Sequence, residues 1–171
     1  DAGIDGMIVT RHTDLYYFTG TMQSGFLFVP SDGEPAFYVR RSVSRAEEEG
    51  KVPVAPLGSL RTLGARAAES LPAFAGKRKE ALTYDTLPVE WFERLSAAFP
   101  DAVWTDGSKL IREIRMTKDA SEIGCIRRGG QIVGEALKAA LDSATPGMRE
   151  IELLAEIEYE LRRRGHLNIC R

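Results

Sequence analysis

The two histidines, His12 and His166, are the side chains most able to do acid–base or metal chemistry near neutral pH. A catalytic zinc site usually takes three protein ligands at helix or strand spacing, and His12 has only Asp14 close by in the sequence. His166 directly follows Gly165 and would be a ligand on its own. We therefore interpret His12 as a surface or turn residue, with a gate beside a neighbouring site as the alternative. We interpret His166 as a residue at a helix C-terminus.

Other motifs that carry chemistry are missing from the sequence. There is no G-x-S-x-G nucleophile elbow, no G-x-x-x-x-G-K phosphate loop and no G-x-G-x-x-G fingerprint. Cys125 and Cys170 form no C-x-x-C pair and have no metal-binding spacing, so we expect two inert reduced thiols. Gly129-Gly130 lies inside a helical pattern, where we expect close helix packing rather than a ligand. The sequence thus predicts no self-contained catalytic centre.

Length and charge narrow the function classes further. A chain of 171 residues corresponds to one domain, or to one domain and part of another. Its 23 basic and 25 acidic residues are scattered, for a net charge of -2, which disfavours nucleic acid as a partner. The apolar runs are too short to span a membrane, and no signal segment opens the chain. We therefore expect no membrane association and a cytoplasmic location.

Short strand-like runs alternate with helical patterns through the first hundred residues, which is typical of an α/β fold. We expect strands at 7–10, 25–29, 35–39, 52–55, 81–84 and 102–105, and helices at 42–49, 59–71 and 88–98. Ser31-Asp32-Gly33-Glu34 provides the turn chemistry of a hairpin between the second and third strands. The pattern predicts a mixed β-sheet flanked by helices.

From Asp119 onward the pattern is purely helical. Asp119 and Glu122 have the spacing of a capping box at a helix start. A second helix is expected after Pro146-Gly147, ending at Gly165. Apolar residues recur along the first helix at three- and four-residue spacing, namely Ile123, Ile126, Val133, Leu137 and Leu141, with Gly130 among them. A two-helix hairpin cannot enclose a core of its own, so we expect this stripe to be under-buried.

Several segments together resemble the creatinase/prolidase/aminopeptidase P family. Tyr16-Tyr17-Phe18-Thr19-Gly20 is similar to its Y-Y-L-T-G segment, and residues 31–35 are similar to its D-G-E-P hairpin. Residues 115–123 resemble its R-x-x-K-x-x-x-E-I connector, and Pro146-Gly147-Met148 follows in order. The resemblance implies a creatinase/prolidase-like N-terminal domain over 1–112. It implies that 113–171 are the connector and first two helices of an incomplete pita-bread catalytic domain. Arg149 departs from the family, where a capping Thr is common, and puts local helix stability in doubt.

The family resemblance also implies a reaction. Peptidase members hold two divalent metal ions, Mn, Co or Zn, with two Asp, one His and two Glu in the C-terminal domain. None of these motifs matches a position here, and Asp142 is the last aspartate. We therefore expect no metal, cofactor or activity in this chain. The full-length protein is expected to be an Xaa-Pro dipeptidase or aminopeptidase P acting on proline-containing peptides. Its N-terminal domain would serve homodimer formation and shape the substrate entrance.

The resemblance directs attention to one loop for substrate access. In family members the loop after the aromatic segment can reach over a neighbouring subunit's active site; here it is Thr21-Met22-Gln23-Ser24, with His12 as a possible companion. We expect the Tyr16-Tyr17-Phe18 aromatics to be core and turn packing. Two other readings of the parent protein stay open: a creatinase-like hydrolase that cleaves C–N bonds without metal, and a non-catalytic protein-binding module.

Overall fold

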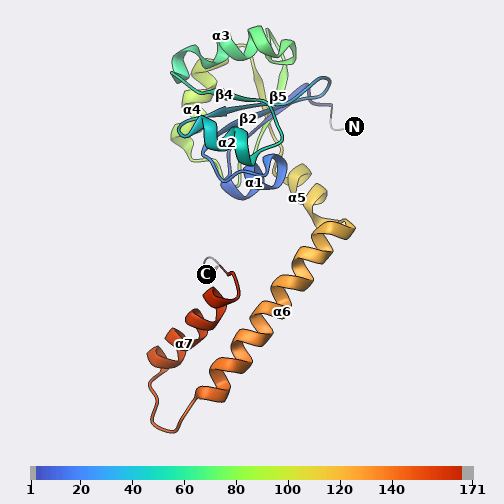
Figure 1. Ribbon diagram of the computed structural model, residues 1–171. Coiled ribbons are helices and arrows are strands. Elements are labelled where there is room, and N and C mark those ends of the chain that lie inside the picture. Colours follow the sequence, from blue (N-terminus) through green and yellow to red (C-terminus); the bar gives the residue numbers. More distant parts are fainter. Residues whose placement is uncertain (1–2, 167–171) are drawn as a thin grey trace. The chain divides into compact units, whose positions relative to one another are not determined.

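The computed structural model describes residues 3–166 (Figure 1). The chain divides into two compact units, Asp1–Arg115 and Met116–Arg171, and each is described by itself. The boundary expected at residue 112 lies within helix α5 (Ser108–Met116).

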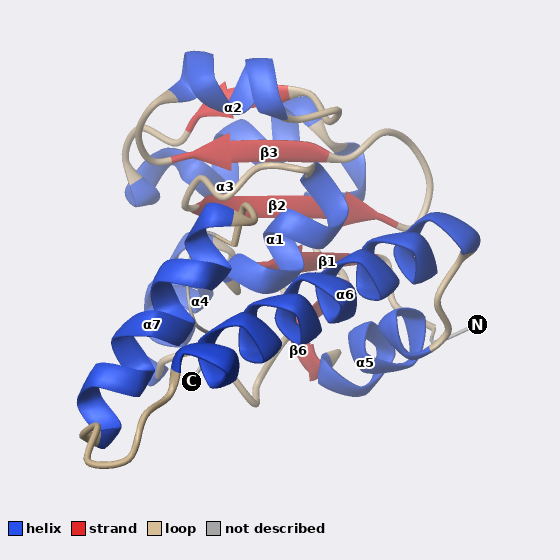
Figure 2. Cartoon of the chain, turned by 60° about the horizontal axis from the view of Figure 1, so that its bottom comes forward, coloured by secondary structure: helices blue, strands red, loops and turns tan. Residues whose placement is uncertain are grey.

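A six-stranded mixed sheet forms the centre of the first unit, in the order β4-β3-β2-β1-β5-β6. Figure 2 shows β3, β2 and β1 side by side. The β1–β2 and β2–β3 pairs are antiparallel, whereas β3–β4, β1–β5 and β5–β6 are parallel. The strands are β1 (Gly6–Val9), β2 (Gly25–Pro30), β3 (Ala36–Val39), β4 (Val54–Pro56), β5 (Lys79–Leu82) and β6 (Val103–Asp106). This confirms the expected fold class and hairpin, with β4 and β5 shifted by about two residues from their predicted positions.

The hairpin strands show how the sheet separates two hydrophobic cores. Because side chains alternate along a strand, Phe26 and Phe28 face one side while Leu27 faces the other. Phe28 lies in the core beneath α3 (Leu60–Ser70) and α4 (Val89–Ala98), which also contains Leu63 and Leu95. Leu27 lies in the core that includes residues of α1 (His12–Thr19), α2 (Val43–Glu49) and α5. Both faces of the sheet are therefore covered by helices.

The predicted helices at 42–49, 59–71 and 88–98 correspond to α2, α3 and α4, and a short 3-10 turn, η1 (Pro72–Phe74), follows α3. Ser59 caps α3, its hydroxyl accepting from the Arg61 N–H at 3.2 Å. Two helices were not predicted, α1 and α5. The aromatic run in α1 has strand-like composition, yet Gly20, at φ 82°, closes a helix there by donating to the Tyr16 carbonyl at 2.9 Å.

The aromatic segment is not uniformly core, contrary to the expectation for Tyr16-Tyr17-Phe18. Tyr16 and Tyr17 are exposed and Phe18 is half-buried. In a helix only the positions three and four apart share a face, so three consecutive aromatics cannot all point inward. Leu15 and Thr19, four apart, are buried on one face of α1, and Asp14 is buried beside them in the sequence.

The second unit consists of α6 (Ala120–Ser143) and α7 (Glu150–Arg163), packed against each other. The predicted capping box is confirmed: the Asp119 carboxylate accepts from the Glu122 N–H, and Glu122 accepts from the Asp119 N–H, both at 2.8 Å. At α7 only half of such a box forms. Glu152 accepts from the Arg149 N–H at 2.9 Å, but the Arg149 guanidinium has no acceptor atom for the Glu152 N–H.

The packing of α6 confirms the exposed apolar stripe and corrects the prediction made for Gly129-Gly130. Buried Ala136 and Ala140 lie on α6, whereas the expected stripe from Ile123 to Leu141 is exposed, as predicted. Gly129 and Gly130 do not mark close packing, since a Cβ at either would meet no atom of the described chain within 4 Å apart from its own stretch of helix. Gly165, at φ 92°, follows α7, and the His166 N–H donates to the Leu161 carbonyl at 3.0 Å. Cys125 is exposed, and Cys170 lies outside the described residues.

Candidate functional site

His12 and Ser24, twelve residues apart, are brought together by α1 and the following loop. His12 is the first residue of α1, and its Nε2 lies 2.8 Å from the Ser24 Oγ. A nucleophile pair for hydrolysis would also need a group that orients the imidazole. The described residues show no such partner on His12, and the contact ties the end of the loop to the start of α1.

Thr21, expected at a substrate entrance, anchors the start of the loop. It is almost fully buried, and its Oγ1 donates to the Glu49 carboxylate at the end of α2, at 2.7 Å. This hydrogen bond, with a second from Arg45, holds the pKa of Glu49 below its usual value. Gly50 N–H donates to the Ala46 carbonyl and closes the same helix end. Thr21 therefore ties the start of the loop to the end of α2.

Met22 and Gln23 are the part of the loop that remains accessible. Met22 is 57% exposed, although a thioether side chain is usually buried. Gln23 is half-buried, and its N–H donates to Thr21 Oγ1 at 3.3 Å. The loop thus presents one flexible apolar side chain between two tethered ends, at Thr21 and at Ser24.

A cavity of about 310 Å³ adjoins this loop. His12 and Ser24 line it on one side, and Arg40, Thr86 and Trp91 contribute to the other walls. The N–H of Arg40 donates to the Ser24 carbonyl at 2.9 Å, which extends the β2–β3 pairing up to the cavity. The lining residues include no carboxylate, so the cavity suits apolar or anionic groups better than a metal cation.

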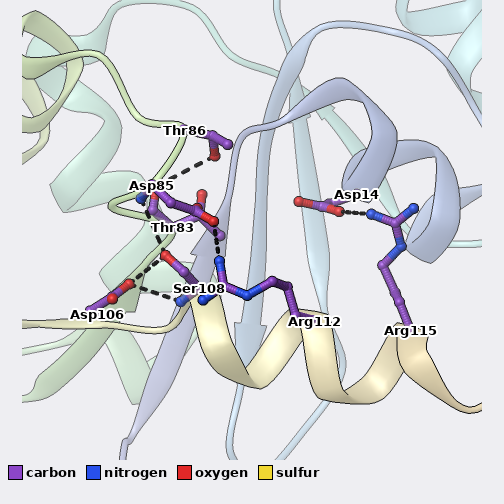
Figure 3. A network of polar contacts seen from close by, with 8 residues as sticks. All are labelled: Asp14, Thr83, Asp85, Thr86, Asp106, Ser108, Arg112 and Arg115. Atoms are coloured by element: carbon purple, nitrogen blue, oxygen red, sulfur yellow. Dashed lines mark hydrogen bonds and ion pairs between the residues drawn. The ribbon is translucent and has the colours of Figure 1, made fainter. Parts of the chain in front are cut away.

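Two arginines of α5 join that helix to the rest of the first unit (Figure 3). Arg115 pairs with Asp14 of α1 at 2.5 Å, and Asp14 is only 2% exposed. The Arg115 guanidinium carbon also lies 5.4 Å from the centre of the Tyr17 ring. One turn earlier, Arg112 pairs with Asp85 in an exposed position. The first residue of the connector motif therefore contacts the aromatic motif, which sequence spacing could not show.

Ser108 begins α5 and is held from two directions in Figure 3. Its Oγ donates to the Asp106 carboxylate at 2.5 Å and accepts from the Asp85 N–H at 3.2 Å. The Ser108 hydroxyl and N–H together hold the pKa of Asp106 below its usual value. An Asp two residues before a Ser is a helix-start signal, and it could have predicted α5.

Glu80 is a second group that sequence reasoning missed. It lies on β5, is 1% exposed, and neither carboxylate oxygen has a hydrogen-bond partner in the described chain. Burial, and secondarily the charge of Asp5, raises the pKa of Glu80 to about 7, against the opposing effect of Arg78. A Cβ on Gly6 would lie 2.7 Å from Glu80 Oε2, so the glycine makes room for the carboxyl.

The described residues do not fit a metal centre. Between residues 3 and 166 there is no group of three or more His, Cys, Asp or Glu side chains placed to hold a metal ion. None of the helices in that range is long and apolar enough to cross a membrane. The described residues thus offer contact surfaces and a cavity.

Comparison with known proteins identifies the family. The Creatinase/Prolidase N-terminal domain family matches residues 1–117, and the chain therefore belongs to this family. It is 26% identical over 165 residues to an Xaa-Pro dipeptidase of Pyrococcus furiosus, covering 95% of this chain and 45% of that protein. It is 28% identical over 170 residues to the uncharacterized peptidase YqhT of Bacillus subtilis, covering 95% of this chain and 46% of that protein.

Solved structures agree with this assignment. The prolidase from Pyrococcus furiosus superposes with a TM-score of 0.77 at 25% identity, covering 95% of this chain and 46% of that one. The X-Pro aminopeptidase from Thermotoga maritima shares the fold, with a TM-score of 0.83 at 22% identity, covering 95% and 47%. The chain thus spans slightly less than half the length of these four relatives.

Proposed function

We propose that the chain is the N-terminal part of an Xaa-Pro peptidase of the metallohydrolase type, acting on proline-containing peptides. The observation that supports this best is similarity along 95% of the chain to an Xaa-Pro dipeptidase, together with the family match over 1–117. The two divalent metal ions, Mn, Co or Zn, would be held by residues outside 3–166, since no metal-binding group occurs within that range. The described chain would have two roles, assembly into a homodimer and control of substrate access, and the protein would act in the cytoplasm.

Within that proposal, the loop Thr21-Met22-Gln23-Ser24 borders the substrate entrance of a partner subunit. Burial of Thr21 and the His12–Ser24 contact support this role, because they fix both ends of a short loop. The exposed Met22 would then contact apolar side chains of a bound peptide. Methionine suits such contacts, because its thioether chain adapts to different shapes.

The proposal is tested by assaying the full-length protein that contains this sequence. We expect release of proline from Xaa-Pro dipeptides, loss of that activity after chelation, and recovery with Mn²⁺, Co²⁺ or Zn²⁺. The 171-residue chain alone is the matched control and should release none. Metal-independent conversion of creatine would instead identify a creatinase-like hydrolase. No turnover of either substrate by folded, metal-loaded protein would favour a binding module.

A further inference from the structure

Three arginines converge on a second and larger cavity of the first unit. A cavity of about 710 Å³ lies between the turn that joins β4 to α3 and the helix α4. Arg40, Arg61 and Arg94 line it, and its other lining residues are uncharged. The whole sequence has a net charge of -2, so this concentration of positive charge is local. We call this site the arginine cavity.

Within residues 3–166, two of these arginines pair with no carboxylate. Arg94 pairs with Glu90 at 2.5 Å, one helical turn away on α4. Arg40 and Arg61 form no ion pair with any carboxylate of the described residues, and both are exposed. Arginine is always protonated at physiological pH, so these two groups carry uncompensated charge beside a concave surface.

Aromatic stacking holds part of the arginine cavity in place. The guanidinium carbons of Arg40 and Arg94 lie 5.5 and 5.4 Å from the centre of the Trp91 ring, within range of cation–π attraction. A guanidinium that is already positioned loses less rotamer freedom when a ligand binds. Since Trp91 is already in contact with two guanidinium groups, the cavity offers positive charge more than a free aromatic face.

The wall formed by the β4–α3 turn is also fixed. Arg66 donates to the carbonyls of Pro56 and Leu57, at 2.8 and 2.6 Å, which places a further cation behind the turn. Gly58 follows at φ 63°, a conformation that side chains with a Cβ rarely adopt. The turn is therefore held in one shape next to Arg61.

We propose that the arginine cavity binds a small multivalent oxyanion that carries phosphate or carboxylate groups. Guanidinium groups recognise both chemistries by paired N–H donors. Because two unpaired arginines and one paired arginine face the same space, a ligand with two or more negative charges should bind much more tightly than a monovalent anion. The proposal does not depend on peptidase activity, so either can fail without the other.

Isothermal titration calorimetry on the 171-residue chain tests this directly, with inorganic pyrophosphate and citrate as separate probes in buffer of low ionic strength. The test variant is R40Q/R61Q, which should fold because both side chains are exposed. The matched control is R127Q/R128Q, which removes the same charge from exposed positions on α6. Circular dichroism and the urea midpoint check that all three proteins are equally folded.

We expect saturable one-to-one binding of at least one probe, weakened at least tenfold in R40Q/R61Q and unchanged in R127Q/R128Q. Binding should also change Trp91 fluorescence. Binding of pyrophosphate alone would assign a phosphate ligand, and binding of citrate alone a carboxylate ligand. The proposal is overturned if neither probe binds saturably to the wild type. It is also overturned if both double variants weaken binding equally, or if R40Q/R61Q binds as tightly as the wild type.

Discussion

At the scale of single residues, Glu80 shows how a buried carboxyl links structure to pH. Its oxygens are unpartnered in the described chain, and the folded protein raises its pKa from 4.5 to about 7. The sequence predicted a strand that begins at Ala81, so Glu80 was expected just before it, whereas β5 begins at Lys79. The sequence could not predict the burial, because Gly6, which lies beside the carboxyl, is far from Glu80 in the chain.

Glu80 should make the protein less stable as the pH rises. A raised folded-state pKa means that the folded state binds the proton more tightly than the unfolded state does. The stability that the protonated Glu80 carboxyl contributes is therefore fully present below pH 4.5 and is lost as the pH rises through 7. The free energy of unfolding should fall by up to about 3 kcal/mol across this window. Urea denaturation from pH 4.5 to 8 should show a flatter profile for Glu80→Gln. Glu93→Gln, an exposed change on α4, is the control; equal slopes for Glu80→Gln and wild type would contradict the account.

At the scale of elements, the hairpin and the capped helix α6 could be predicted because their signals are local. The turn at 31–34 and the Asp119–Glu122 capping box each lie within a few residues. Helix α1 was missed because its aromatic run has strand-like composition, and its stability rests on tertiary contacts such as that of Asp14 with Arg115. Likewise, the hydrogen bond between Thr21 and Glu49 spans 28 residues, so the sequence could not separate Thr21 from the exposed part of its loop.

The two arginines of α5 should contribute very differently to stability. Arg115→Gln leaves the buried carboxylate of Asp14 without its ion-pair partner, which should cost about 2 kcal/mol of unfolding free energy. Arg112→Gln breaks an exposed pair with Asp85 and should cost less than about 1 kcal/mol. Chemical denaturation of both variants measures the difference. Equal losses would show that burial of Asp14 does not matter, and Asp14→Asn in a double-mutant cycle isolates the pair itself.

At the scale of the whole molecule, the helical unit exposes a row of apolar side chains along one helix. Ile126, Val133, Leu137 and Leu141 of α6 are each more than two-fifths exposed. Burying one such side chain is worth about 1.5–3 kcal/mol, so several together favour contact with another surface. The sheet unit has two buried cores, and α6 of the helical unit leaves an apolar stripe exposed in the described chain.

We expect the 171-residue chain to self-associate as its concentration rises. Light scattering or sedimentation should show a mass above that of the monomer, and Val133→Gln/Leu137→Gln should restore the monomer without loss of helix content. The exposed pair Arg127→Gln/Arg128→Gln is a control that leaves the apolar stripe intact. A strictly monomeric wild type at high concentration would show that the exposed stripe does not drive association.

The central claim about this chain is that it shapes substrate access, and the loop after α1 tests it most directly. In the full-length protein, Met22→Ala/Gln23→Ala should raise the KM for longer proline-containing peptides about fivefold, since roughly 1 kcal/mol of apolar contact is lost. The double variant should leave the KM for dipeptides, the metal content and the unfolding midpoint unchanged. The control is Glu34→Gln, which lies after the end of β2 that is farther from the loop, and it should leave all kinetic constants unchanged. Unaltered kinetics across peptide lengths, in a protein shown to be dimeric, would contradict the claim and leave this loop a structural connection.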